Sequence, residues 1–187
     1  MTYNPTTTLR QYDEAARFCK DIFLKKTRDY GTSWRVLRTI SVVDQIFIKV
    51  QRIRTIQNTG ERKVGDDIRS EFIGIVNYGI IGLIQLQLGS DTIEDLPEAN
   101  ADALYSEQLE TIKQLMLKKN HDYGEAWREM SQESLADLIL VKLLRIRQIL
   151  ANNGKTLISE GIDANYHDIV NYALFALILI EEGVHKN

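Results

Sequence analysis

The chain has 187 residues, of which 44% are hydrophobic and 26% charged, and its net charge is −3. This composition is typical of a soluble globular protein. The charges form no basic stripe or acidic tail, which argues against direct DNA binding. Cys19 is the only cysteine, so no disulfide forms within the chain. We expect a cytoplasmic protein without a signal peptide. We also expect no membrane span, because the longest apolar run, 173–180, is far shorter than the roughly 20 residues required.

The sequence repeats itself after 93 residues. Residues 19–58 align without a gap with residues 112–151, and 17 of these 40 positions are identical. Both tryptophans, Trp34 and Trp127, fall at equivalent positions. After a one-residue insertion the alignment continues to Leu86. A period this long, present only twice, indicates the duplication of a small domain rather than a solenoid.

The segment that begins at Gly89 separates the two copies and has the composition of a linker, with Pro97 inside it. We therefore place the first repeat at residues 10–88, the linker at 89–104 and the second repeat at 105–187.

Each repeat is expected to form three helices. In the second repeat the patterns predict helices over about 106–119, 131–151 and 163–182, with Gly124 near the end of the first and Asn153-Gly154 after the second. Strand patterns are absent. Two such units pack most simply around a pseudo-twofold axis, as a homodimer does. The prediction is an all-α bundle of six main helices, and further assembly into a homo-oligomer is compatible with it.

An aromatic motif follows the first helix of each repeat. Tyr123 and Trp127 in the second repeat correspond to Tyr30 and Trp34 in the first. These rings either stack on a nucleobase or belong to the hydrophobic core, and Tyr123 is the candidate ligand contact.

A lysine interrupts the apolar face of the middle helix. On a helical wheel Lys142 falls inside the apolar stripe and Arg145 at its edge, and Lys49 and Arg52 take these places in the first repeat. A lysine in apolar surroundings is costly unless it is paired or reaches water. One interpretation is a structural ion pair with Asp137 or an acid of the third helix. The other is a pair of cations that holds a phosphate in a cleft.

The third helix of the second repeat combines an apolar body with a polar beginning. Asp168, Asn171 and Tyr172 lie within one arc of the wheel, and Asp163 and Glu160 precede them. One interpretation is a satisfied polar plug at a helix N-terminus. The other is a ligand site in which Asp168, Asp163 and Glu160 hold Mg2+ while Asn171 and Tyr172 contact substrate.

The first repeat departs from this pattern. Asp168 aligns with Gly74, whereas Lys49 and Arg52 are retained. The first repeat thus keeps the cations without the main acids, and we expect one dominant site in the second repeat.

The ordered set of motifs resembles the nucleotide modification associated domain 1 family. The resemblance rests on Asp122-Tyr123-Gly124 with Trp127, Lys142-x2-Arg145, Glu160-x2-Asp163 and Asp168-x2-Asn171-Tyr172. It implies a small all-α fold reminiscent of MazG-like nucleoside triphosphate pyrophosphohydrolases and a link to nucleotide metabolism or nucleic-acid modification. MazG-like enzymes carry Glu-x-x-Glu on the helix where this sequence has Lys142 and Arg145.

Three functions follow from these patterns. The leading hypothesis is an enzyme that cleaves a nucleoside triphosphate: Lys142 and Arg145 grip the phosphates, and Asp168 and Asp163, with Glu160, hold Mg2+ or orient water. The second is a module that senses a nucleotide without chemistry. The third is a structural or partner-binding bundle in which the lysines and aspartates pair with each other.

Overall fold

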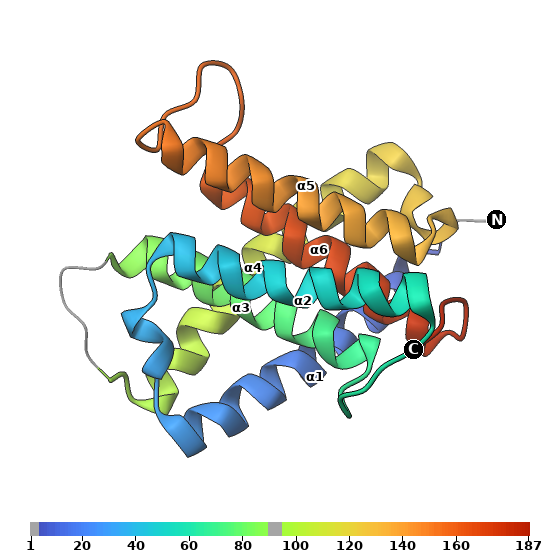
Figure 1. The fold of residues 1–187 in the computed structure, drawn as a ribbon, viewed down its shortest axis with the longest axis horizontal. Helices are drawn as coiled ribbons and strands as arrows, with labels where there is room; N and C mark the ends of the chain where they lie inside the picture. The colour runs from blue at the N-terminus through green and yellow to red at the C-terminus, as the bar shows by residue number, and fades with distance from the viewer. Residues whose placement is uncertain (1–3, 90–94) are drawn as a thin grey trace.

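The computed structural model describes residues 4–89 and 95–187, and its regular structure is entirely helical over those ranges. The elements are α1 (Pro5–Tyr30), η1 (Ser33–Val36), α2 (Thr39–Thr59), α3 (Ile68–Leu88), α4 (Glu98–Tyr123), η2 (Ala126–Glu129), α5 (Gln132–Ala151) and α6 (Ile162–Glu181), with η denoting a 3-10 helix. The all-α fold of six main helices is confirmed (Figure 1).

Two expected end residues of the second repeat are found in the structure, Ser131 at the start of α5 and Gly124 at the end of α4. Ser131 caps α5, because its side chain accepts a hydrogen bond from the backbone nitrogen of Ser134 at 3.1 Å. Gly124 ends α4 in the left-handed conformation, with φ of 60°. The predicted spans of α5 and α6, 131–151 and 163–182, each agree with the observed helices to within one residue at either end.

The predicted start of α4 is wrong. The helix begins at Glu98, directly after Pro97, and so includes residues 98–104 of the expected linker. Ala101 and Tyr105 are fully buried and lie one turn apart on the same face, which docks this first part of the helix on the bundle. Helix α4 thereby matches α1 in length, at 26 residues each.

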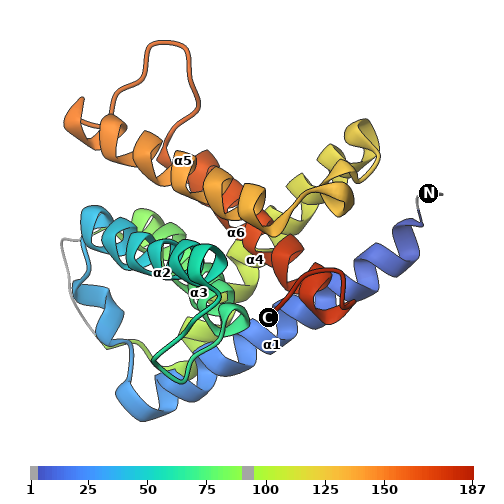
Figure 2. The same ribbon diagram turned by 45° about the vertical axis from the view of Figure 1, so that its right-hand side comes forward.

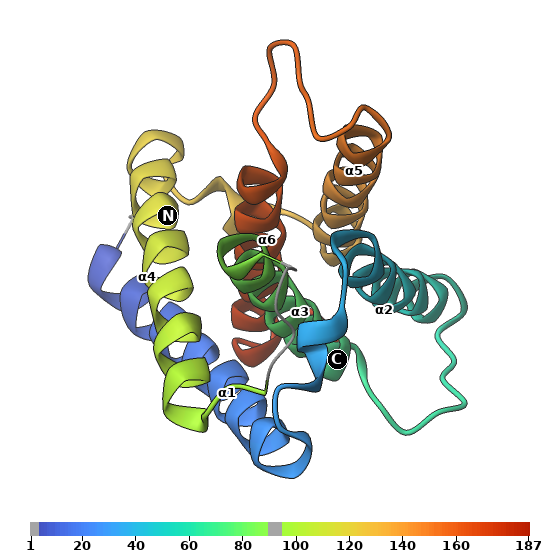
Figure 3. The same cartoon turned by 90° about the vertical axis from the view of Figure 1, so that its left-hand side faces the viewer.

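The bundle has three layers. Helices α3 and α6 form the middle layer, with α1 and α4 on one side and α2 and α5 on the other (Figure 3). The middle helices are the most apolar and the most buried. Helix α3 is long and apolar enough to cross a membrane, but 72% of its apolar stretch is buried inside the protein, as in the core helix of a bundle. Each layer pairs one helix from each repeat, so the two repeats share one core.

Helices α3 and α6 approach closely at two glycines. A Cβ atom on Gly82 would lie 2.5 Å from the ring of Tyr166, and one on Gly79 would lie 2.6 Å from Val170. The absence of side chains here lets the two central helices pack closely.

Reciprocal ion pairs across the outer layer show the pseudo-twofold symmetry. Arg54 of α2 pairs with Asp137 of α5 at 3.3 Å, and Arg147 of α5 pairs with Asp44 of α2 at 2.9 Å. Arg54 and Asp44 are the repeat equivalents of Arg147 and Asp137. The arrangement is that of an isologous dimer interface within one chain.

Candidate functional site

Asp168 lies at the centre of the predicted site and is held by two lysines. Its carboxylate accepts from Lys119 of α4 at 2.7 Å and pairs with Lys142 of α5 at 2.9 Å. The Asp168 and Lys142 side chains are 9% and 13% exposed. The ion-pair interpretation of Lys142 is therefore confirmed, with Asp168 rather than Asp137 as its partner. Lys119 was not predicted, because a wheel of one helix does not show what another helix presents.

The two ammonium groups decide the charge state of Asp168. Burial acts to raise the pKa of this carboxyl, but the hydrogen bonds and charges of Lys119 and Lys142 outweigh it, and the pKa lies below its usual value. For Lys119, burial acts to lower the pKa, and Asp168 more than reverses this. Each carboxylate oxygen of Asp168 thus already has a cationic partner. A Mg2+ ion bound to this carboxylate would lie beside two ammonium groups that repel it, so this residue does not fit a metal site.

The other two predicted metal ligands lie apart from Asp168. Asp163 is exposed in the first turn of α6, and Glu160 is exposed in the preceding loop. Over residues 4–89 and 95–187, no group of three His, Cys, Asp or Glu side chains is placed to hold a metal ion. The structure therefore does not bring the expected Mg2+ trio together.

The remaining candidates of the second repeat have structural surroundings. Asn171 is buried, accepts from Tyr12 at 2.8 Å and donates to the backbone oxygen of Ile112 at 3.3 Å. This leaves it closed to a ligand, contrary to the prediction. Tyr172 is half-buried, and burial and Asp168 raise its pKa. Tyr123 is 73% exposed and lines none of the cavities described below.

Trp127 is a core residue rather than a base-stacking surface. Its ring stacks on Phe175 with centroids 4.2 Å apart and planes 3° from parallel. Its indole nitrogen donates to Asn120 at 3.2 Å. The core interpretation of the second tryptophan is therefore confirmed.

The first repeat has an acid that the alignment concealed. Glu71 accepts from Arg52 at 2.7 Å and from Lys49 at 3.4 Å, and its side chain is 8% exposed. It aligns with Asn165, one turn before the position of Asp168. A longer side chain one turn earlier on the same helix face thus replaces the missing aspartate, which corrects the expectation that this repeat lacks the acid.

The first repeat contains a cleft of about 640 Å³. It lies between the C-terminal half of α1, η1, α2 and α3. Two lysines, several aromatic rings and two acids line it: Lys26, Lys49, Phe23, Tyr30, Trp34, Tyr78, Asp66 and Glu71. Lys26 is the repeat equivalent of Lys119, and Tyr30 and Trp34 belong to the recurring aromatic motif.

Two residues that are smaller than their equivalents in the second repeat account for the cleft. Gly74 stands where the second repeat has Asp168, and the Lys49 side chain lies across it, within 2.7 Å of where a Cβ would be. Ile81 stands where the second repeat has Phe175, so Trp34 lacks the stacked partner of Trp127. Without the aspartate and the ring, the space stays open.

Trp34 also leaves a polar group unsatisfied. Its buried indole nitrogen has no hydrogen-bond partner in the described part of the chain. The second repeat satisfies this group with Asn120, whose equivalent, Thr27, instead donates to the backbone oxygen of Phe23 at 2.9 Å. An unpaired buried donor is uncommon and marks the wall of this cleft as incomplete.

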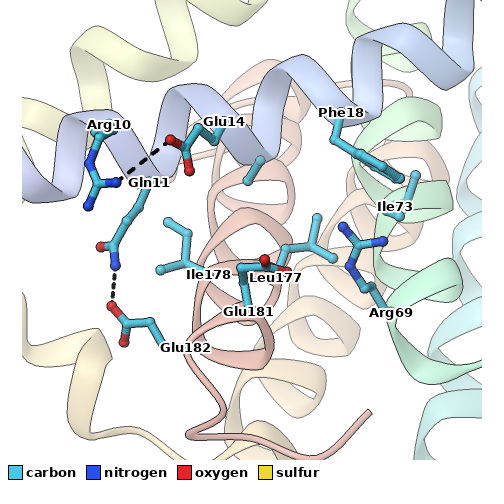
Figure 4. Close-up of a pocket in the computed structure, with 11 residues that line it drawn as sticks. Arg10, Gln11, Glu14, Phe18, Arg69, Ile73, Leu177, Ile178, Glu181 and Glu182 are labelled. Carbon is cyan, nitrogen blue, oxygen red and sulfur yellow. Dashed lines mark hydrogen bonds and ion pairs between the residues drawn. The ribbon is translucent and has the colours of Figure 1, made fainter.

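Two further cavities lie elsewhere. One, of about 710 Å³, is lined by Arg145 and Glu160 of the second repeat. The other, of about 350 Å³, lies between α1, α3 and α6 and is shown in Figure 4. Its rim carries charges of both signs, and Arg10 and Glu14 pair across 3.8 Å within it. Neither Lys142 nor Asp168 lines any of the three cavities.

The model of the family described as nucleotide modification associated domain 1 matches residues 26–86 and 119–180 of this chain. The chain belongs to this family. The two matches begin 93 residues apart and end 94 apart, which is the offset of the internal alignment. The nucleotide modification associated unit is thus one repeat, and the chain contains it twice. No curated protein and no solved structure matched the chain.

The family unit begins at Lys26 in the first repeat and at Lys119 in the second. It therefore includes the lysine that reaches Asp168 and the lysine that lines the cleft, but excludes most of α1 and α4. All eight cleft residues named above, except Phe23, lie within the matched segment 26–86.

Proposed function

We propose that this protein binds a nucleoside phosphate in the cleft of the first repeat, without a resident metal ion and without hydrolysis. The observation that carries the proposal is the convergence of two lysines and three exposed or half-buried aromatic rings on one cavity of about 640 Å³. That volume suits a nucleotide, since small-molecule sites generally measure about 300–1,000 Å³.

The lysines supply the phosphate-binding end. Lys26 is exposed and has no hydrogen-bond or ion-pair partner among the residues of the described chain. The contact of Lys49 with Glu71 is long, at 3.4 Å, whereas Arg52 pairs closely with that carboxylate, at 2.7 Å. Because Arg52 already neutralises Glu71, the charge of Lys49 is available to an anion, and a lysine ammonium binds phosphate oxygens as a point charge.

The aromatic rings supply the base-binding end. Tyr30 is 72% exposed at the mouth of the cleft, and Trp34 and Tyr78 are half-buried in its wall. Stacking of a nucleobase on such rings contributes about 1–3 kcal/mol and tolerates any base. The unpaired indole N–H of Trp34 adds a donor at the same wall.

The proposal favours the sensing module over the hydrolase expected from the motifs. Metal-assisted phosphoryl chemistry needs carboxylates free to bind the cation. Here Asp168 is held by two lysines and Glu71 by Arg52, while Asp163 and Glu160 stand apart. The family membership supports a link to nucleotides but does not by itself distinguish binding from catalysis.

The test is a titration of the full chain with each deoxynucleoside triphosphate, with and without Mg2+, followed by analysis of the products. Lys26→Gln and Lys49→Met remove the charges, and the methionine keeps a long apolar stem across Gly74. Each is expected to weaken binding at least about tenfold, which corresponds to 1.4 kcal/mol. Lys25→Gln is the matched control, since Lys25 is exposed and pairs with Asp21 outside the cleft.

Two results would reject the proposal. Nucleotide affinity that is the same in Lys26→Gln, Lys49→Met and Lys25→Gln would exclude the cleft as the binding site. Release of pyrophosphate that Asp168→Asn abolishes would instead establish the hydrolase with its centre in the second repeat.

A further inference from the structure

The second repeat contains an arginine without the partners of its counterpart. In the first repeat, Arg52 donates to Glu71 at 2.7 Å and to the backbone oxygens of Val64 and Asp66 at 3.2 and 2.5 Å. The equivalent Arg145 is exposed and has no hydrogen bond or ion pair with any residue in 4–89 or 95–187. The guanidinium at this position is thus hydrogen-bonded in the first repeat and available to a ligand in the second.

A substitution accounts for the missing carboxylate. Glu71 of the first repeat corresponds to the neutral Asn165, whose amide nitrogen donates to the backbone oxygen of Gly161 at 2.8 Å. A second acid is lost nearby, since Asp67, which caps α3 at Ser70, corresponds to Gly161. Helix α6 therefore begins without a side-chain cap.

Arg145 and Asn165 face a common cavity of about 710 Å³ beneath the α5–α6 loop. The residues of this loop from 152 to 160 are all exposed, and the loop stands out from the bundle (Figure 2). Lys155 is the second cation of the cavity lining, and Glu160 is its one acid. Asp163 is exposed in the first turn of α6 and is not part of the lining.

We propose that this cavity binds a phosphate group, whose oxygens take the place that the Glu71 carboxylate occupies beside Arg52 in the first repeat. The guanidinium of Arg145 donates two parallel hydrogen bonds to such a group, and Lys155 adds a point charge. Phosphate is favoured over a carboxylate because two cations line the cavity, and a phosphate group carries about −1.5 to −2 charges at neutral pH, against −1 for a carboxylate. The site is separate from the first-repeat cleft and does not rest on the proposed function.

The experiment titrates the full chain with inorganic phosphate at constant ionic strength and follows the phosphorus resonance. Arg145→Gln is expected to weaken binding at least about tenfold. Lys118→Gln, an exposed lysine on α4 outside the cavity, is expected to leave it unchanged. No binding by the natural sequence, or equal binding by Arg145→Gln, would overturn the proposal. Acetate binding as tight as phosphate binding would overturn the assignment to phosphate.

A second variant tests the comparison between the repeats directly. Asn165→Glu restores the first-repeat acid, so it is expected to weaken phosphate binding at least about tenfold while raising the urea midpoint of unfolding. A folded Asn165→Glu protein that binds phosphate as well as the natural sequence would contradict the proposal.

The phosphate has two natural sources, which a third arm separates. In a Lys26→Gln/Lys49→Met protein, inorganic phosphate and dAMP are titrated in turn, each with and without Arg145→Gln. Arg145-dependent binding of both points to a nucleotide as the source, and binding of inorganic phosphate alone points to the free ion. Binding of neither overturns the site.

Discussion

The hydroxyl of Tyr12 in the first repeat donates to the side-chain oxygen of Asn171 in the second, at 2.8 Å. The equivalent Tyr105 donates to Asn77 at the same distance, in the opposite direction across the pseudo-twofold axis. Each asparagine also donates to a backbone oxygen of its own repeat, Asn77 to Cys19 at 3.0 Å and Asn171 to Ile112 at 3.3 Å. The four side chains are buried and tie α1 and α4 to the middle layer.

Removal of one hydroxyl from this network is expected to be costly. Tyr12→Phe leaves the side-chain oxygen of Asn171 buried without its donor, which lowers the free energy of unfolding by about 1–3 kcal/mol. Tyr166→Phe is the control, because the buried Tyr166 hydroxyl has no partner in the described chain. Its removal is expected to be neutral or stabilising. Urea unfolding of both variants measures the difference, and a larger loss for Tyr166→Phe would contradict the network.

Asp168→Asn is expected to destabilise the protein by about 3 kcal/mol at neutral pH. The substitution leaves Lys142 charged and nearly buried, and the value lies at the low end for a broken buried pair because Lys119 is 47% exposed and can turn to water. The pKa of Asp168 is lower in the folded protein than the unfolded value of about 3.9. Its contribution is therefore complete above that pH and is lost as the pH falls further. Urea unfolding across pH checks this: a constant difference down to pH 2 would refute it.

Gly74→Asp is expected to close the first-repeat cleft. The new carboxylate would meet Lys26 and Lys49 as Asp168 meets Lys119 and Lys142. Only the flexible end of the Lys49 side chain has to move, so stability should change by less than about 1 kcal/mol. Nucleotide affinity should fall at least about tenfold by calorimetric titration. Unchanged affinity would show that the cations of this cleft do not bind phosphate.

Thr27→Asn is expected to raise the free energy of unfolding by about 0.5–1.5 kcal/mol, the net value of one hydrogen bond. It supplies to Trp34 the acceptor that Asn120 gives Trp127. The reverse change, Asn120→Thr, strands the indole nitrogen of Trp127 and should destabilise. Urea midpoints of the two variants that shift in the same direction would count against this account.

The sequence predicted those features that depend on a single helix. Ser131 and Asn153-Gly154 mark the ends of α5 because capping is local chemistry. The wheel identified Lys142 as nearly buried and Arg145 as peripheral, which the structure confirms. The start of α4 was missed because its first turns are polar and carry only Ala101 as a buried residue before Tyr105.

Contacts between two helices could not be predicted from the residue pattern of either helix alone. Lys119 meets Asp168 only because α4 packs beside α6. Glu71 was aligned with Asn165 and its role was therefore missed, although its position one turn before Gly74, on the same face, was a signal in the sequence. The cleft itself arises because Gly74 and Ile81 are smaller than Asp168 and Phe175 at the equivalent positions, and a smaller side chain creates no recognisable sequence motif.

The crossed Tyr12–Asn171 and Tyr105–Asn77 bonds mean that neither half supplies the donor to the side-chain oxygen of its own buried asparagine. A single unit would need a second copy of itself to supply the missing tyrosine hydroxyl. In such a homodimer every amino-acid substitution would occur in both subunits. Joining the halves in one polypeptide removes that constraint. One half can keep an ion-pair cluster around Asp168 that holds α4, α5 and α6 together, while the other gives up the same residue and gains an opening.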